Sequence, residues 1–231
     1  SSLRVAEIFR QEGKFEEAYQ ELVSVQEIAE ERFYKAKVQM RIGDNYMEWK
    51  RYDDAYTAYN QVIELYADTG YPPNAQYNKG EARYYAGQYA EARDEYLKVV
   101  QDYPDVDTQL RALSLYNAGF ASEKLEDYDR VEELFNKVVE DYPRSEQAPI
   151  CLLRLGQLKY KKGQTAEATE IYRQLVDTYG DSKTGQDALY SLGVLLRNDG
   201  KLAEALQVFA QVDREAGDTY VSALTARASI L

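Results

Sequence analysis

Adjacent carboxylates are the side chains of this 231-residue sequence with the clearest potential for acid–base or metal chemistry. Examples are Glu16-Glu17, Asp53-Asp54 and Glu132-Glu133. Two carboxylates that share a proton or a metal ion must converge, whereas neighbouring residues on a helix point about 100° apart. These pairs therefore indicate solvated helix faces and do not predict a catalytic centre.

The other residue types needed for catalysis are scarce. The sequence has no histidine and a single cysteine, Cys151, so it lacks a triad base, a zinc-binding cysteine pair and an intrachain disulfide. Its glycines are spread along the chain and form no phosphate-binding loop. We expect no enzyme activity, no cofactor and no metal site, and we interpret Cys151, which lies in an apolar run, as a small buried hydrophobe.

The charge of the chain restricts its partners. Lys and Arg total 28 against 40 Asp and Glu, which gives a net charge of −12, and the excess of acid is larger in residues 1–110 than in 111–231. Such a surface repels phosphate backbones and anionic lipid, so nucleic acid and bare membrane are not expected as partners. No apolar run is long enough for a membrane span.

A short pattern recurs six times, and its first copy is Gly13-Lys14-Phe15-Glu16-Glu17-Ala18. We call the last residue of each copy the repeat marker. The markers are spaced by 37 residues, with one interval of 39, and are Ala18, Ala55, Ala92, Val131, Ala168 and Ala205. A period of this size indicates stacked units, each of which buries its apolar face against the next.

Each unit is predicted to contain two helices, because apolar residues at helical spacing lie before and after the pattern, as in 152–158 and 171–176. The glycine that opens the pattern is typical of a helix C-terminus, where it takes a left-handed conformation. Two copies have Lys50 and Glu126 at this position. Those turns need either a different residue in that conformation or a different turn.

Small residues recur twelve positions before the marker, namely Ala6, Gly43, Gly80, Gly119, Gly156 and Gly193. A glycine inside a helix costs about 1 kcal/mol relative to alanine, so its recurrence predicts a close approach of the paired helix. Second helices are predicted to end at Asp102-Tyr103-Pro104 and Asp141-Tyr142-Pro143, because proline cannot continue a helix. Tyr71-Pro72-Pro73 is predicted to serve the same purpose.

These positions together are similar to the motif of the tetratricopeptide repeat family, which has small residues near its eighth, fifteenth and twentieth positions and an aromatic residue at the twenty-fourth. The match covers almost the whole chain and includes the aromatic residues Tyr59, Tyr96, Phe135, Tyr172 and Phe209. The resemblance implies an all-α fold, a right-handed superhelical solenoid of six antiparallel helix pairs plus a terminal helix. First helices of such a solenoid line a concave groove.

We expect one array over residues 1–231. Its repeats are predicted at about 1–30, 35–71, 73–106, 112–145, 148–182 and 186–216, followed by a terminal helix at 219–231. This last helix is either a lone cap or the start of a further repeat, and the phase at Ser1 favours a chain cut from a longer array. The 37-residue unit also resembles that of bacterial envelope tetratricopeptide lipoproteins of the outer-membrane-assembly and Tol-Pal-associated type.

The resemblance also implies which residues face the groove. After Glu7 and Arg10 of the first unit, they are Met40, Asp44, Met47, Tyr77, Glu81, Tyr84, Tyr116, Phe120, Glu123, Leu153, Gln157, Tyr160, Tyr190, Val194 and Arg197. This surface is aromatic through its middle, and rigid aromatic side chains are frequent interface hot spots. The clamp of Lys, Asn and Arg with which some family members hold a chaperone's carboxylates is not expected, because Asp44 and Glu81 would repel them.

We therefore expect a non-catalytic scaffold that binds a protein or peptide with apolar anchors and basic residues, and the resemblance to envelope lipoproteins implies a place in bacterial envelope assembly. Two alternatives stay open: the helper or targeting region of a larger enzyme or secretion machine, and an array that mainly self-associates. The repeat style favours the periplasm or cell envelope over the cytoplasm, although the lone cysteine leaves the compartment open. The sequence does not determine the oligomeric state.

Overall fold

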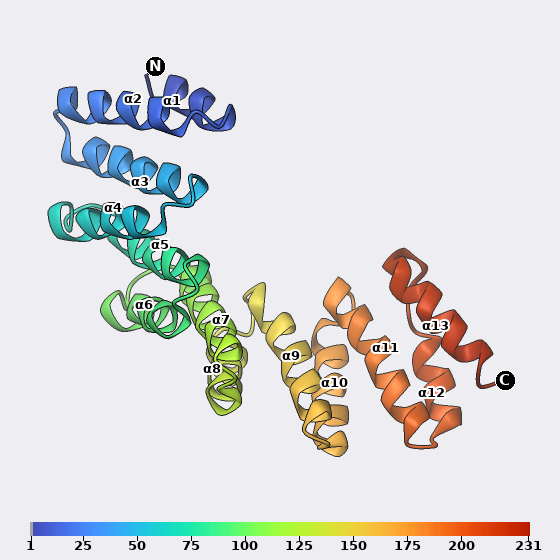
Figure 1. Cartoon of the computed structure of the whole chain (residues 1–231). Helices are drawn as coiled ribbons and strands as arrows, with labels where there is room; N and C mark the ends of the chain where they lie inside the picture. Colours follow the sequence, from blue (N-terminus) through green and yellow to red (C-terminus); the bar gives the residue numbers. More distant parts are fainter. Residues whose placement is uncertain (1) are drawn as a thin grey trace. The chain divides into compact units, whose positions relative to one another are not determined.

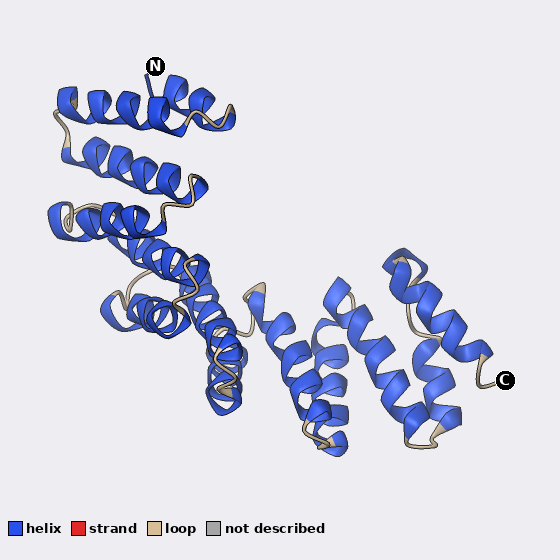
Figure 2. Cartoon of the chain, viewed as in Figure 1, coloured by secondary structure: helices blue, strands red, loops and turns tan. Residues whose placement is uncertain are grey.

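The computed structural model describes residues 2–231, and within this range the chain forms helices and turns without any strand (Figure 2). Thirteen α-helices and one short 3₁₀ helix occur there. They are α1 (Ser2–Gln11), α2 (Phe15–Ile28), α3 (Arg32–Glu48), α4 (Tyr52–Leu65), α5 (Pro72–Tyr85), α6 (Tyr89–Asp102), α7 (Thr108–Lys124), α8 (Tyr128–Asp141), α9 (Gln147–Lys161), α10 (Thr165–Tyr179), α11 (Lys183–Asn198), α12 (Leu202–Phe209), η1 (Arg214–Ala216) and α13 (Asp218–Ala228).

The helices belong to two compact units, Ser1–Leu134 and Phe135–Leu231, whose boundary falls within α8. In the first unit consecutive helices from α1 to α7 pack against one another, and in the second unit those from α9 to α13 do the same (Figure 1). The predicted all-helical fold of successive packed pairs is thus confirmed. The grouping of all repeats into one array over 1–231 stays a prediction.

All six turns of the repeated pattern use a left-handed residue, which the sequence predicts for the four copies with glycine and allows as one of two alternatives for the other two. Four of these residues are glycines, such as Gly87 with φ +79°, and the other two are Lys50 with φ +62° and Glu126 with φ +59°. The turn at Gly87 is closed by two backbone hydrogen bonds, of 3.0 Å from Gly87 N to Tyr84 O and of 2.9 Å from Gln88 N to Arg83 O. This pair of bonds satisfies the last carbonyls of the helix.

Glu126→Gly is expected to raise the free energy of unfolding by about 0.5–1 kcal/mol. A side chain in the left-handed region costs about 1–2 kcal/mol, while glycine gives back part of that gain through its greater freedom in the unfolded chain. Urea unfolding followed by circular dichroism measures the change. Gly163→Ala is the matched control and should destabilise, because Gly163 has φ +77° and no atom within 4 Å of an added Cβ. A lower midpoint for Glu126→Gly would contradict this account.

The helix glycines have the predicted packing role, and the structure shows what approaches them. A Cβ on Gly43 would lie 2.7 Å from Cδ1 of Tyr59, and one on Gly80 would lie 2.5 Å from Cδ1 of Tyr96. In each case the ring belongs to the second helix of the same repeat, four residues after the marker. The close approach therefore involves an aromatic side chain whose Cδ1–Cε1 side lies against the glycine of the first helix.

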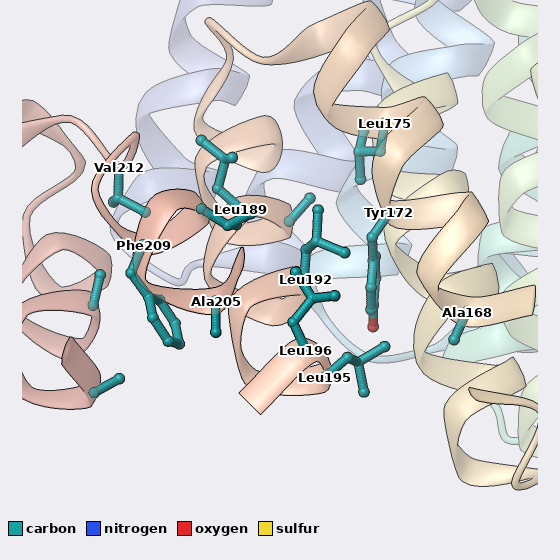
Figure 3. Close-up of a cluster of buried hydrophobic side chains, with 14 of the residues drawn as sticks. Ala168, Tyr172, Leu175, Leu189, Leu192, Leu195, Leu196, Ala205, Phe209 and Val212 are labelled. Carbon is teal, nitrogen blue, oxygen red and sulfur yellow. The ribbon is translucent and has the colours of Figure 1, made fainter. Parts of the chain in front are cut away.

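Apolar side chains from successive helices form the cores of both units. In the second unit, Tyr172 and Leu175 of α10 meet Leu189 and Leu192 of α11, and Phe209 of α12 continues the same cluster (Figure 3). These side chains are at most 4% exposed. Because each helix buries its apolar face against its neighbours in the chain, the repeats are stable without a single central core.

Cys151 is fully buried in α9, as predicted, and burial raises the pKa of its thiol.

None of the described helices is long and apolar enough to cross a membrane.

One predicted helix end is wrong. Pro72 does not end a second helix: α4 already ends at Leu65, and Pro72 is the first residue of α5, where its missing N–H is not needed. The first helices α3 and α7 begin at Arg32 and Thr108, and the repeat bounds themselves stay a prediction.

Candidate functional site

Four of the predicted groove residues come together in one pocket of the first unit. Glu81 and Tyr84 come from α5, and Tyr116 and Phe120 come from α7. The pocket has a volume of about 220 Å³. We call it the aromatic pocket. It forms because residues three or four apart on a helix share a face, so that each of two first helices of successive repeats contributes a pair of side chains.

A hydrogen-bond network fixes the polar wall of the aromatic pocket. The Tyr96 hydroxyl donates to Oε1 of Glu81, and Asn117 Nδ2 donates to the same oxygen at 3.1 Å. Asn117 Nδ2 also lies 2.7 Å from the Tyr77 hydroxyl oxygen. A carboxylate with two donors on one oxygen is held in place, and it brings a negative charge to the pocket wall without further ordering cost.

The aromatic rings of the pocket also support one another. Tyr116 and Phe120 pack edge to face with ring centroids 4.6 Å apart, and Tyr84 packs edge to face on Tyr89 at 5.2 Å. Burial, followed by nearby charge, raises the pKa of Tyr77 and of Tyr84, so both phenols are neutral near pH 7. The pocket therefore offers neutral hydroxyl groups and half-buried rings beside a fixed carboxylate.

Two acidic residues that were predicted to face the groove, Asp44 and Glu81, also accept hydrogen bonds from buried tyrosines of the protein itself. Asp44 Oδ1 accepts a hydrogen bond of 2.9 Å from the buried Tyr59 hydroxyl, as Glu81 does from Tyr96. Both acids stand eleven residues before the marker. In the sixth repeat the ring is Phe209, which has no hydroxyl, and that position is the apolar Val194. The carboxylate thus satisfies a buried phenol in the second and third repeats, whereas the fifth repeat has Gln157 at this position beside Tyr172.

The remaining predicted groove residues do not line the aromatic pocket. Met40 and Met47 pack against a core cluster of the first unit, and Leu153, Tyr190 and Val194 pack against that of the second. Glu123 and Arg197 are half-buried, while Gln157 and Tyr160 are exposed. Tyr77 does not line the pocket, but it contacts two residues that do, Asn117 through a hydrogen bond and Tyr96 through ring packing at 5.5 Å. The role of the whole set in one ligand groove stays a prediction.

Sequence reasoning missed three residues that line the aromatic pocket. They are Tyr85, Tyr96 and Asn117. Tyr96, an aromatic position of the repeat motif, is a core residue with 1% of its surface exposed, yet it also lines the pocket. The sequence contains a pattern that could have pointed to Asn117. Both Asn117 and Asn78 stand fourteen residues before the marker of their repeat.

The adjacent carboxylates do not converge on a common site. Asp53 pairs with Arg83 at 2.7 Å, whereas Asp54 pairs with Arg51 at 2.6 Å. Within the described residues, no group of three or more His, Cys, Asp and Glu side chains could hold a metal ion.

Comparisons with known proteins agree with the repeat structure. One tetratricopeptide repeat family model matches residues 40–107 and 153–219, more than half of the chain, and a second matches residues 113–145. A search of curated proteins returned no match.

Solved structures with a similar fold include the apo form of RapI, at 14% identity and a TM-score of 0.67 over 99% of this chain and 74% of that one. A tetratricopeptide repeat protein from Parabacteroides merdae has 16% identity and a TM-score of 0.59 over 99% and 84% of the two chains. YrrB, described as having an unusual peptide-binding site, has 18% identity and a TM-score of 0.55 over 89% and 96%.

Proposed function

This chain belongs to the tetratricopeptide repeat family, and we propose that within it the chain is a non-catalytic scaffold that binds a segment of another protein at the aromatic pocket. Proteins of this family are in general interaction scaffolds. The observation that carries the proposal is the meeting of Tyr84, Tyr116 and Phe120 beside the fixed carboxylate of Glu81.

The chemistry of the pocket specifies the kind of segment. Half-buried aromatic side chains gain the most from an apolar anchor that fills the space between them. Glu81 adds a negative charge that favours Lys or Arg next to that anchor, mainly by setting orientation and association rate. The ligand is therefore an extended or helical segment with an apolar anchor and a neighbouring basic residue.

Tyr84→Ala combined with Tyr116→Ala is expected to weaken binding of such a segment by at least a hundredfold, because each buried anchor contact is worth about 2 kcal/mol or more. A peptide selected from a random library on the immobilised wild-type chain serves as the probe, and calorimetry gives its Kd.

Two control variants test whether a loss of affinity comes from the aromatic rings of the pocket. Phe33→Ala removes an exposed aromatic residue outside the pocket and should leave the Kd unchanged. Glu81→Gln keeps an acceptor for Tyr96 but removes the charge, so it should reduce the salt dependence of binding. Undiminished affinity of a double variant that keeps its helical circular dichroism would place the site elsewhere.

The partner and compartment form a further part of the proposal. The 37-residue unit and its Asp141-Tyr142-Pro143 junction support a role in bacterial envelope assembly, with the chain in the periplasm. Fractionation of cells that express the full-length protein tests this placement, and an exclusively cytoplasmic pool would contradict it.

A further inference from the structure

The first repeat lacks the aromatic residue that every other repeat has four positions after its marker. This position holds Leu22 in the first repeat, and the five other repeats have Tyr59, Tyr96, Phe135, Tyr172 and Phe209. In the second repeat the ring of Tyr59 lies on Gly43, and its hydroxyl donates to Asp44 and interacts with Asn78. The first-repeat residues equivalent to Gly43, Asp44 and Asn78 are therefore expected to surround Leu22.

Those equivalent positions line an open pocket of about 430 Å³ between α1, α2 and α3. They are Ala6, Glu7 and Arg41, at the places of Gly43, Asp44 and Asn78. Leu22 is shorter than a tyrosine, so the outer part of the space that a ring takes in the other repeats is left open. We call this space the first-repeat pocket.

The first-repeat pocket is basic although the chain carries a net charge of −12. Its lining includes four cationic side chains, Arg4, Arg10, Lys37 and Arg41, and one acid, Glu7. Glu7 pairs with Arg10 at 2.7 Å, Arg10 also lies 3.3 Å from Glu48, and Arg41 lies 3.2 Å from Asp44, so Arg4 and Lys37 carry the charge that no ion pair among the described residues balances. The remaining positive charge favours a ligand with negative groups, which is the opposite of the preference at the aromatic pocket.

A buried acceptor in the wall lacks a donor. Asn45 is fully buried, and its Nδ2 donates to Phe15 O at 2.9 Å, but its Oδ1 has no hydrogen-bond partner. An unsatisfied buried acceptor costs about 1–3 kcal/mol, which makes this wall of the first-repeat pocket a polar one. A phenol suits this wall, because its hydroxyl can donate to a carbonyl oxygen and accept from a guanidinium group.

We propose that the first-repeat pocket binds a tyrosine side chain of a partner protein, flanked by Asp or Glu residues. The partner's ring lies over Leu22 and Ala18, and its acidic neighbours pair with Arg4, Lys37 and Arg41. The incoming ring takes a position further out than that of Tyr59, because Ala6 has a methyl group where Gly43 has none. This subsite is distinct from the aromatic pocket and does not depend on it.

A short peptide with blocked ends tests the proposal. Acetylated and amidated Glu-Glu-Tyr-Glu-Glu should shift the amide resonances of residues around Leu22 and Arg41 of the full chain, with a Kd at least tenfold lower than that of Glu-Glu-Ala-Glu-Glu. The blocked ends exclude recognition of a terminal carboxylate. Equal affinity for the two peptides, or shifts confined to other helices, would overturn the proposal.

Two variants locate the site on the protein. Leu22→Tyr with Ala6→Gly recreates the pair found in the second repeat, fills the pocket from within and should weaken binding at least tenfold. Arg41→Gln with Lys37→Gln keeps the core intact and should weaken it similarly, whereas Lys35→Gln, on the same helix but outside the lining, should not. The Tyr84→Ala and Tyr116→Ala variant should bind this peptide normally, which separates this proposal from that for the aromatic pocket.

Discussion

Glu95→Leu is expected to lower the free energy of unfolding by about 3–5 kcal/mol, because it leaves a buried ammonium group without its counter-ion. Lys79 and Glu95 are each 6% exposed, and their charged atoms lie 3.3 Å apart. Without the carboxylate, Lys79 would retain a hydrogen bond of 2.9 Å to Asn60 Oδ1 and the face of the Tyr56 ring. These contacts do not replace a charge partner.

The double variant Lys79→Leu with Glu95→Leu should recover most of the lost stability. Leu155 and Ile171 occupy the equivalent positions of the fifth repeat, so the two leucines approximate an apolar pair that the fold already uses. Gln76 keeps a hydrogen bond of 2.9 Å to the backbone oxygen of residue 95. Urea unfolding of wild type, single and double variants measures the coupling, and a double variant no more stable than Glu95→Leu would contradict it.

The dependence on pH gives a second check on the same pair. Burial raises the pKa of Glu95, but hydrogen bonds from Gln76 and Lys98 and the charge of Lys79 outweigh it, so the pKa lies below its ordinary 4.5. The unfolded chain then binds the proton more readily than the folded one. The stabilisation by Glu95 is complete above about pH 4.5 and is lost as the pH falls further, so the double variant should lose less stability than wild type in acid.

Gly156→Leu should lower the free energy of unfolding by about 3 kcal/mol, because the added side chain meets a ring that cannot move away. A Cβ at this position would lie 2.8 Å from Cδ1 of Tyr172, whose side chain is 3% exposed and packed among α9, α10 and α11. Thermal unfolding followed by circular dichroism measures the change.

Two further variants show whether the loss of stability comes from the contact with the ring. Glu167→Gln lies on an exposed face of α10 and should change stability by no more than about 0.5 kcal/mol. Gly156→Leu combined with Tyr172→Ala frees the space of the ring, so leucine should then cost less than it does in wild type. Equal melting temperatures for Gly156→Leu and Glu167→Gln would refute the assigned packing.

The first-repeat pocket and the Lys79–Glu95 pair have a common origin in the departures of single repeats from the common pattern. Leu22 stands where the others have a ring, and Lys79 stands where the fifth and sixth repeats have Leu155 and Leu192. A strict repeat would give only equivalent interfaces. The departures create local charge, cavities and unsatisfied groups, which are the features that can recognise a particular partner.

The sequence by itself determined the period, the two-helix unit and the four left-handed turns that contain glycine. Even the turns at Lys50 and Glu126 were among the possibilities that the pattern allowed, and the structure shows the left-handed one. These features follow from the sequence because they depend on the conformation of a few consecutive residues and on apolar spacing along one helix.

Only the tertiary structure decided which side chains meet. Asn117 of α7 reaches Glu81 of α5 across 36 residues of sequence, and the hydroxyl of Tyr96 satisfies the same carboxylate. Neither contact is encoded in the local pattern, since it depends on how two helices pack and on the length and direction of each side chain. For the same reason, the sequence could place Glu81 on a groove but could not show that the protein itself holds its carboxylate in position.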